Sequence, residues 1–435
     1  MSHLQRYRFS PRVFPLEGVP FDAGELFARL RPVCRGISLL DSAAGDPRRW
    51  SLLAFDPLPA RLDESLEPPS VEALRGFVER LEAVAGDSVP GPFAGGFVGA
   101  LSYDLGVEGE DLELPRDPWQ QPLILGALYC DFLVVDHAAS RVDLVLGDEP
   151  GDGRPSVVQR RETIEAHLQR SAPEPEAVIA GAIERDVSSA EHCARVSEIR
   201  ERIAAGDFYQ ANLSHRSSCT VVGSAHDLYR QLRRVNAAPW AAFLEWDPSR
   251  QWGGALSSGA LLSASPELLL EFLERGDDGA RIARTRPIKG TAPRHSDPSL
   301  DRAAAESLLA SEKDRSELAM IVDLERNDLG RVARAGGVRV PQFPKLESYA
   351  TVHHLVADVI AELPAERDAF DVLGAIFPGG SITGAPKVAS MRAIAELERE
   401  GRGFFTGSAG FIDTQGRALW NILIRTLVWR TAPGG

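Results

Sequence analysis

The sequence predicts an α+β fold, and three observations lead to this class. Residues 1 to about 150 show apolar runs separated by turn signals, the pattern typical of strands, with few helical patterns. The second half interleaves strand-like runs with long segments of helical apolar spacing. Residues 171–188, rich in Pro, Glu and Ala, resemble a linker. We therefore expect one region at 1–180 and a second at 181–435.

The composition and charge of the chain indicate which classes of binding partner to expect. The 435 residues are 44% hydrophobic and 25% charged, which is ordinary for a globular protein. A formal charge of -14 argues against a nucleic-acid binder or a protein of anionic membrane surfaces. No apolar run approaches the roughly 20 residues of a membrane span, and the first residues lack the apolar core of a signal peptide. The scattered cysteines form no C-x-x-C pair, so we expect a reduced, cytoplasmic setting without nucleic-acid or membrane partners.

The first half is predicted to contain mainly strands. Apolar runs and turn residues predict strands at 37–42, 50–55, 95–104 and 123–135, the last pairing with 141–147. Helical spacing predicts helices at 71–85 and 154–170.

The second half is predicted to begin with a helix. A capping-box pattern at 188–191 starts it, and Gly206 can end it. Further helices are predicted at 301–324, 346–363 and 387–400. Strands are predicted at 209–214, 241–246, 261–270 (with an internal turn), 281–289, 403–413 and 418–429.

A stiff stretch at 285–291 presents a single lysine, Lys289. Pro287 fixes its own φ, and Gly290 permits a tight turn or the close approach of a ligand. A lysine held in this way can be a nucleophile if burial or a cationic neighbour such as Arg286 lowers its pKa. The alternative is a solvated lysine in a basic hairpin.

Three carboxylates are candidates for chemistry. Glu267 follows Ser-Pro in a turn between apolar strands, where partial desolvation would raise its pKa and suit it to general acid–base work. Asp314 and Glu317 lie three residues apart on one face of a predicted helix and offer the oxygen ligands that magnesium prefers. The alternatives are a strand-end carboxylate in water and a solvated helix face.

Other segments could bind an anion. The glycine-rich turn at 378–387 opens a predicted helix, where backbone amides bind anions such as carboxylates. Arg425 lies inside an apolar predicted strand and suits bidentate carboxylate recognition. A structural turn and a structural salt bridge remain as alternatives. His354, in the predicted helix at 346–363, fits a core histidine.

Taken together, these stretches resemble the chorismate-utilising enzymes. The matching blocks occur in the family's order, at 206–214, 265–267, 287–291, 321–331, 352–356, 380–387, 402–403 and 424–426. Weaker matches at 39–42 and 95–104 extend the resemblance over nearly the whole chain. It implies an α+β fold with two packed antiparallel β-sheets and helices on the outside.

The resemblance also implies a reaction. Lysine at position 289 points to the branch that adds ammonia to chorismate, because the anthranilate branch usually has alanine there. The water-adding branches usually carry a lysine where this chain has Gln210. We therefore expect 4-amino-4-deoxychorismate, made for para-aminobenzoate and folate through a covalent lysine intermediate. Anthranilate formation, or a catalytically silent subunit that binds and regulates a glutaminase, are the alternatives.

Residue roles follow from the same resemblance. Lys289 would be the nucleophile and Glu267 the general acid. Mg²⁺ would be held partly by Glu317, with Asp314 on the same helix face. The substrate would be bound by Thr291, His354, Thr383, Gly384 and Arg425.

The resemblance implies partners as well. Ammonia would come from a separate class I glutaminase subunit. The relatives bind tryptophan, and the matching places here are Ser42, Arg49, Trp50, Pro239 and Trp240. In the family, a Gly-rich strand and a last helix with another metal-binding glutamate follow the strand of Arg425. The sequence reaches Gly435 without them, so we expect either a truncated sequence or an incomplete metal site.

Overall fold

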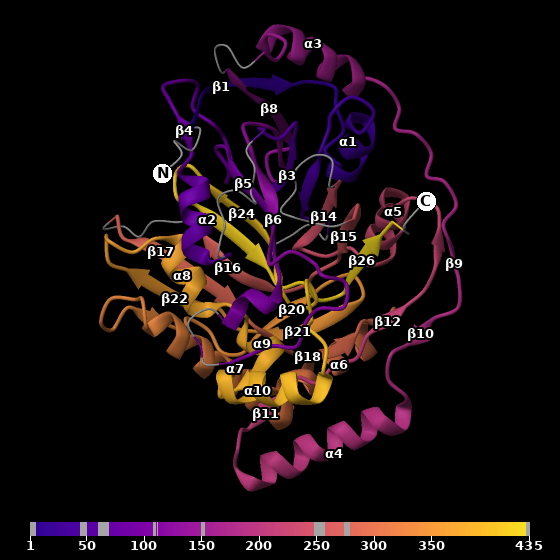
Figure 1. Cartoon of the computed structure of the whole chain (residues 1–435), viewed down its shortest axis with the longest axis vertical. Coiled ribbons are helices and arrows are strands. Elements are labelled where there is room, and N and C mark those ends of the chain that lie inside the picture. The colour runs from indigo at the N-terminus through magenta and orange to yellow at the C-terminus, as the bar shows by residue number, and fades with distance from the viewer. Residues whose placement is uncertain are drawn as a thin grey trace.

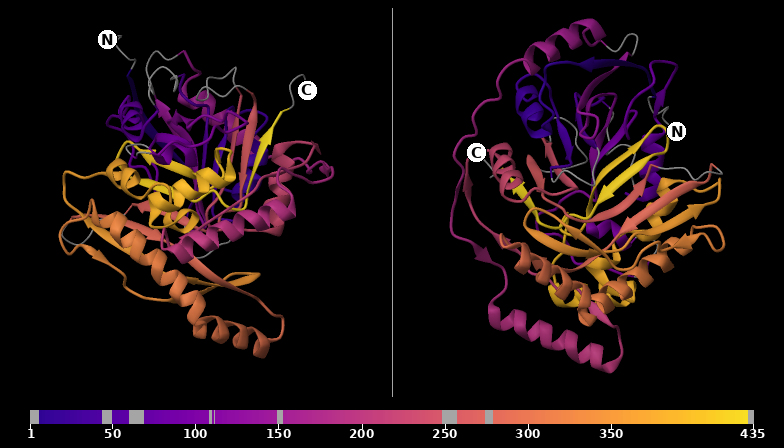
Figure 2. Two further views of the ribbon diagram at one scale, coloured as in Figure 1. Left: turned by 60° about the horizontal axis from the view of Figure 1, so that its bottom comes forward. Right: turned by 180° about the vertical axis from the view of Figure 1, so that it is seen from behind.

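The computed structural model describes residues 6–43, 50–59, 69–107, 110, 112–148, 153–247, 257–273 and 279–431. Two large sheets, mostly antiparallel, pack face to face with helices on their outer sides (Figure 1, Figure 2). This confirms the predicted α+β fold with two packed sheets.

In the described part of the chain, the first sheet has nine strands, in the order β26-β15-β14-β2-β3-β7-β8-β1-β4. Its neighbours are antiparallel, apart from the parallel pair of β1 and β4. The bounds are β1 Tyr7–Leu16, β2 Ser38–Asp41, β3 Trp50–Phe55, β4 Leu81–Ala83, β7 Asp131–Asp136, β8 Arg141–Asp148, β14 Ala241–Trp246, β15 Gly259–Ser263 and β26 Thr426–Arg430.

The second sheet has eight strands within the same described ranges, in the order β19-β22-β17-β16-β25-β24-β5-β6. Its bounds are β5 Gly96–Leu101, β6 Ile124–Tyr129, β16 Leu268–Phe272, β17 Arg281–Arg286, β19 Val338–Arg339, β22 Val359–Leu363, β24 Ser408–Asp413 and β25 Ala418–Asn421. A smaller sheet continues from it, with β18 (Ile288–Pro293), β21 (Val352–Val356) and β20 (Lys345–Ser348) in that order.

The layers follow from where apolar side chains meet. Between the sheets, residues such as Leu52 and Phe132 of the first pack with Val98 and Phe411 of the second. The outer face of the first sheet is covered by α1 (Ala23–Leu30), α3 (Val157–Leu168) and α5 (Ala225–Val235). The outer face of the second is covered by α2 (Val71–Val78), α7 (Glu312–Gly330) and α8 (Ala369–Ile376).

Both large sheets draw strands from either side of residue 180. β14, β15 and β26 belong to the first sheet, and β5 and β6 belong to the second. The boundary at 180 therefore stays a prediction about regions of the sequence. Figure 1 shows the segment after α3 running along the outside of the molecule to α4 (Ser189–Ala205). Two short ladders, β9 (Ile179–Ala180) with β13 (Val221–Val222) and β10 (Glu184–Arg185) with β12 (Ser217–Ser218), hold it there.

One of the two hydrogen bonds of the predicted capping box is present at the start of α4. The side chain of Ser188 accepts a hydrogen bond from Glu191 N–H, and Gly206 ends the helix with φ 92°. The remaining elements are η1 (Tyr103–Val107), β11 (Gln210–Ala211), α6 (Pro298–Ala310), α9 (Gly380–Thr383), β23 (Gly384–Ala385) and α10 (Lys387–Glu398). In the described residues, no helix is long and apolar enough to cross a membrane.

The predicted helix at 346–363 is wrong. This stretch forms β20, β21 and β22, which belong to the smaller sheet and to the second sheet. Its β-branched residues, including Val352, Val356 and Ile360, favour strands, and the helical spacing of its apolar residues arises mainly from β21 and β22, which are short and largely buried. His354 consequently lies on a strand.

Several other predicted elements are interrupted. The strand predicted at 123–135 is divided between β6 of the second sheet and β7 of the first, and the helix predicted at 71–85 ends at Val78, before β4. The helix predicted at 301–324 breaks at Ser311, whose extended backbone ends α6 and whose side chain caps α7 by accepting from Asp314 N–H. The strand predicted at 418–429 is two strands, because β25 and β26 belong to different sheets. Arg425 lies in the bend between them.

Candidate active site

The turn that carries Glu267 is fixed by its neighbour Ser265. The Ser265 hydroxyl donates to Ile422 O (2.6 Å) and accepts from Glu267 N–H (3.2 Å). The Glu267 side chain is buried, and one carboxylate oxygen accepts from Ile288 N–H (3.2 Å). Burial raises the pKa of Glu267, while Lys289, Ser381, the Ile288 amide and Arg425 oppose the shift. This buried carboxyl can hold a proton that a carboxylate in water would lose.

Lys289 reaches the same place from β18. Its side chain is half-buried, and Nζ donates to the carbonyl oxygen of Ser381 at 3.0 Å. Its charge also acts on Glu267, so the amine and the buried acid are neighbours. Arg286 is engaged elsewhere, in ion pairs with Glu347 and with Asp358 (3.6 Å). An amine held beside a buried acid is an arrangement that supports nucleophilic and general acid chemistry together.

The glycine-rich turn lies beside Lys289, which donates to its Ser381 carbonyl. Gly384 pairs with Ala211 between β23 and β11, with φ 144°. A Cβ there would lie 2.0 Å from Gln210 O, so the close approach requires glycine. Thr383 is fully buried; its hydroxyl donates to Gly379 O (3.0 Å), and its carbonyl accepts from Asn212 N–H (2.9 Å). The turn is thus a rigid part of the backbone.

Thr291 and His354 lie opposite each other on β18 and β21. Thr291 Oγ1 and His354 Nδ1 are 2.9 Å apart, and the register pairs the two residues directly. Burial lowers the pKa of His354, and the charge of Arg425 acts in the same direction. The neutral form of the His354 imidazole is therefore favoured.

The prediction that Arg425 lies inside an apolar strand is wrong. The residue is exposed, has φ 51°, and lies in the bend between the two large sheets. Its carbonyl accepts from Ala264 N–H (3.1 Å), and its charge acts on both Glu267 and His354. Within the described residues no carboxylate pairs with its guanidinium. A left-handed backbone is costly for a non-glycine residue, and here it directs an available cation toward the site.

The two predicted metal ligands lie on α7. Asp314 is beside Gly290, since a Cβ at Gly290 would lie 2.9 Å from Asp314 Cβ. Glu317, one turn later, is half-exposed and lies 3.8 Å from the Lys313 ammonium. In the part of the chain that the structure describes, no group of three or more His, Cys, Asp or Glu side chains could hold a metal ion. The pair still fits magnesium, which commonly takes one or two carboxylates and completes its shell with water and substrate oxygens.

Sequence reasoning missed a second buried acid, Glu325 on α7. Thr285 Oγ1 donates to it, and burial together with the charges of Glu267 and Asp328 raises its pKa to about 8. Asp328 pairs with the buried Lys387 (2.6 Å). Glu325 and Asp328 continue the row of buried residues along α7. Their spacing from its apolar residues is the sequence pattern that could have indicated their burial. A second titratable carboxyl, Glu325, therefore lies near the predicted acid Glu267.

Three of the five predicted tryptophan-binding residues line one cavity. A cavity of about 370 Å³ is lined by residues that include Trp50, Pro239 and Trp240. Ser42 is buried, and its hydroxyl has no hydrogen-bond partner among the described residues. Arg49 lies outside the described residues. A larger hollow of about 760 Å³, between α1, α5 and the segment after α3, includes none of the predicted site residues.

Comparison with known proteins fits this geometry. The pattern of the family described as chorismate binding enzyme matches residues 42–432. The aminodeoxychorismate synthase component 1 of Klebsiella aerogenes is 40% identical over 77% of this chain and 69% of its own length. The anthranilate synthase component 1 of Streptomyces coelicolor is 38% identical over 90% of this chain and 76% of its own length.

Solved structures give the same result. The anthranilate synthase component I of Streptococcus pneumoniae TIGR4 superposes with a TM-score of 0.71 and 26% identity, covering 88% of this chain and 85% of that one. The family match at 42–432 includes Glu267 and Lys289 and spans most of the chain, and the chain therefore belongs to the chorismate binding enzyme family.

Proposed function

We propose that this protein is an aminodeoxychorismate synthase component I, which converts chorismate and ammonia to 4-amino-4-deoxychorismate. The observation that supports this most is the Lys289 amine, held at 3.0 Å from Ser381 O beside the buried acid Glu267. Relatives of that name reach 40% identity. Such a lysine is the residue that distinguishes ammonia addition through an enzyme adduct from the anthranilate branch.

The first half of the reaction uses both side chains. The deprotonated amine of Lys289 forms a bond to C2 of the chorismate ring, both ring double bonds shift by one position, and the C4–O bond breaks. Glu267, whose raised pKa favours the protonated acid, gives its proton to the departing hydroxyl, which leaves as water. The bound dianion needs local cations, and the guanidinium of Arg425 supplies one.

The second half reverses these bonds. Ammonia forms a bond at C4, both ring double bonds shift back, and the bond between C2 and Lys289 breaks. Ammonia gives up one proton overall, and the enzyme is regenerated. We assign the ammonia to a separate class I glutaminase subunit, since several relatives are named as component 1.

Magnesium would be held by Glu317 and Asp314. When bound, it would supply positive charge to a substrate carboxylate. Other residues of this chain would contact the substrate directly. Thr291 and His354 would contact the substrate on one side, and Thr383 and Gly384 on another; both pairs are held by hydrogen bonds of their own backbone or side chains.

Product identification tests the proposal. The purified chain is incubated with chorismate, magnesium and ammonium salt, and the product is identified by mass spectrometry. Retention of the enolpyruvyl group, with a hydroxyl replaced by an amine, is the expected result. Loss of pyruvate, giving anthranilate, would favour the second candidate, which the relative from Streptomyces coelicolor supports. Absence of turnover with the glutaminase present would point to a regulatory subunit.

We also propose that the 370 Å³ cavity binds tryptophan. Trp50, Pro239 and Trp240 offer apolar and aromatic surface for the indole. Arg284 and Glu271, an ion pair at 3.1 Å that also lines the cavity, offer charges for the carboxylate and amino groups. Calorimetric titration should show binding, weakened at least about tenfold in Trp240→Ala, a loss of roughly 1.4 kcal/mol. Absence of a binding signal with the intact chain would contradict this assignment.

A further inference from the structure

Arg402 follows α10 and is deeply buried, with 6% of its surface exposed. Nε and Nη2 donate to the two carboxylate oxygens of Glu398, at 2.9 and 2.7 Å. Nη1 donates to Ile382 O (3.1 Å) and Thr406 Oγ1 (3.2 Å), and Nη2 also donates to Asn212 O. Every N–H of the guanidinium is therefore used.

Two of these acceptors are backbone carbonyls of the site. Ile382 lies between Ser381, whose carbonyl accepts from Lys289 Nζ, and Thr383. Asn212 lies just after β11; its N–H donates to Thr383 O (2.9 Å), and its Nδ2 to Ser381 O (3.4 Å). The guanidinium therefore joins the two segments that surround the acceptor of the Lys289 amine.

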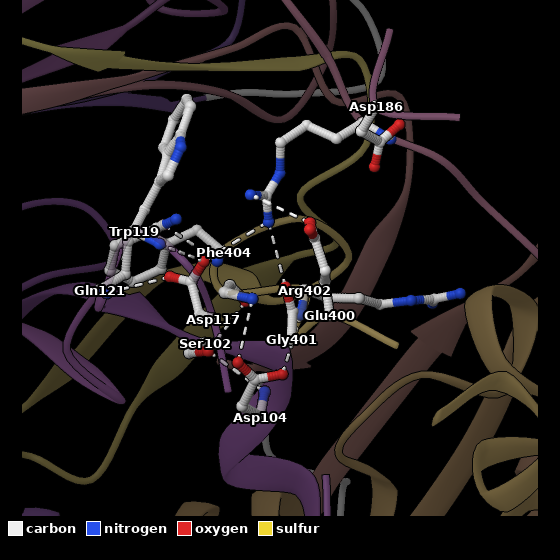
Figure 3. A network of polar contacts seen from close by, with 12 residues as sticks. Ser102, Asp104, Asp117, Trp119, Gln121, Asp186, Glu400, Gly401, Arg402 and Phe404 are labelled. Carbon is white, nitrogen blue, oxygen red and sulfur yellow. Dashed lines mark hydrogen bonds and ion pairs between the residues drawn. The ribbon is translucent and has the colours of Figure 1, made fainter. Parts of the chain in front are cut away.

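The backbone at Arg402 is itself anchored, as Figure 3 shows. Asp104 accepts from the N–H groups of Arg402 (3.2 Å) and Gly403 (3.0 Å), and the Ser102 hydroxyl donates to Gly403 O (2.8 Å). The ring of Tyr103 lies 4.8 Å from the guanidinium carbon. Because both its backbone and its guanidinium are held, Arg402 is a fixed support for the glycine-rich turn that contains Ile382.

We propose that Arg402, oriented by Glu398, is a positioning residue that sets the place of Ser381 O and thus of the Lys289 amine. The inference rests on the proposed function only for the identity of the reaction. Lysine cannot replace it, because a single ammonium cannot contact the carboxylate and both carbonyls in the planar arrangement of a guanidinium. Losing the contacts also leaves the largely buried Glu398 carboxylate without its charged partner, with only the Ser214 N–H (2.7 Å) still donating to it.

Hydrogen exchange gives a readout that needs no activity. In Arg402→Lys, protection of the Tyr209 and Asn212 amides, which donate to the glycine-rich turn, should fall at least tenfold. Arg216→Lys is the matched control. Arg216 donates to Gly401 O (3.2 Å) in the same network but contacts neither the turn nor Asn212. In Arg216→Lys, hydrogen exchange at the Tyr209 and Asn212 amides should be the same as in the unmodified chain.

Kinetics give the second readout. Arg402→Lys should lower kcat on the order of 10²-fold, the effect of a displacement of about 1 Å in a reacting group. KM should change far less, and Arg216→Lys should stay within twofold of the unmodified enzyme. Guanidinium ion should restore part of the rate of Arg402→Ala. Unchanged exchange and unchanged kcat in folded Arg402→Lys would overturn the proposal.

Two further outcomes are decisive. If variants at 402 do not fold, Glu398→Gln tests the same link, because it keeps the shape of the partner and removes its charge. It should give the same exchange pattern with a smaller loss of kcat, and wild-type behaviour would contradict the inference. If the unmodified chain makes a different product, the proposed function fails, while the exchange experiment still decides the role of Arg402.

Discussion

The Lys289 amine has a single hydrogen-bond acceptor among the described residues, Ser381 O, and a buried acid beside it. Lys289→Ala removes the group that would bond to C2 of chorismate. We expect no covalent adduct with chorismate, measured as the mass of the intact protein, and no amination. Lys313→Ala, at an exposed lysine of α7, is the control and should keep the adduct. An adduct that persists in Lys289→Ala would exclude this lysine as the nucleophile.

Glu267 should impose a basic limb on the pH profile. Burial raises its pKa, and only the protonated acid can assist departure of the hydroxyl, so kcat should fall as pH rises through that raised pKa. Glu267→Gln cannot donate a proton and should lose this limb together with roughly 10²- to 10⁴-fold of kcat. Steady-state rates across pH provide the measurement. A variant that keeps both the limb and the rate would show that another group is the acid.

Glu325 should make stability depend on pH. Its pKa rises from 4.5 to about 8 on folding, so between these values the folded state binds the proton and the unfolded state does not. The contribution of this group to the free energy of unfolding should therefore be largest below pH 4.5 and fall by roughly 3 to 5 kcal/mol as pH rises to 8. Urea unfolding across pH measures it.

Glu325→Gln mimics the protonated acid, so it should lose this dependence and gain stability at pH 8. Glu306→Gln, at an exposed helical position, is the control and should leave the dependence intact. A pH dependence that Glu325→Gln leaves intact would place the titrating group elsewhere.

At the scale of elements, the contact between β11 and β23 should be the least tolerant of added volume. Gly384→Ala adds a Cβ 2.0 Å from Gln210 O at a φ of 144°, and should cost roughly 2 to 5 kcal/mol of unfolding free energy. Gly374→Ala is the matched control. It lies in α8 with nothing within 4 Å of its Cβ, and should gain about 0.5 to 1 kcal/mol. Thermal unfolding and chorismate binding measure both, and equal effects would contradict the argument.

At the scale of the whole molecule, the chain should unfold as one unit. Both large sheets contain strands from each side of residue 180, so a fragment of 1–180 lacks β14, β15 and β26 and leaves β5 and β6 without β24. Such edges are unsatisfied, and we expect no cooperative transition from either fragment by calorimetry. Cleaving the folded chain at a protease site near residue 175, in the exposed segment, is the control and should leave the two pieces associated. A separate transition from 1–180 would instead establish independent domains.

Local patterns were enough for the parts of this protein that depend on neighbours in sequence. The cap at Ser188, the end at Gly206, and strands such as β3 and β8 appear where turn residues and apolar runs predict them. The motif blocks, read as a resemblance, predicted the fold and the family. These features are fixed by backbone conformation and by short-range spacing, which a sequence displays directly.

The tertiary structure decided what depends on distant partners. Residues 346–363 show helical spacing of apolar residues but form strands of two sheets, because β21 and β22 are largely buried in those sheets and their β-branched residues suit strands. Arg425 leaves its strand because β25 and β26 lie in different sheets. Glu325 acquires its raised pKa from burial beside Glu267, a residue distant in sequence. Desolvation and charge act through space, so these properties appear only when the sheets and α7 are assembled.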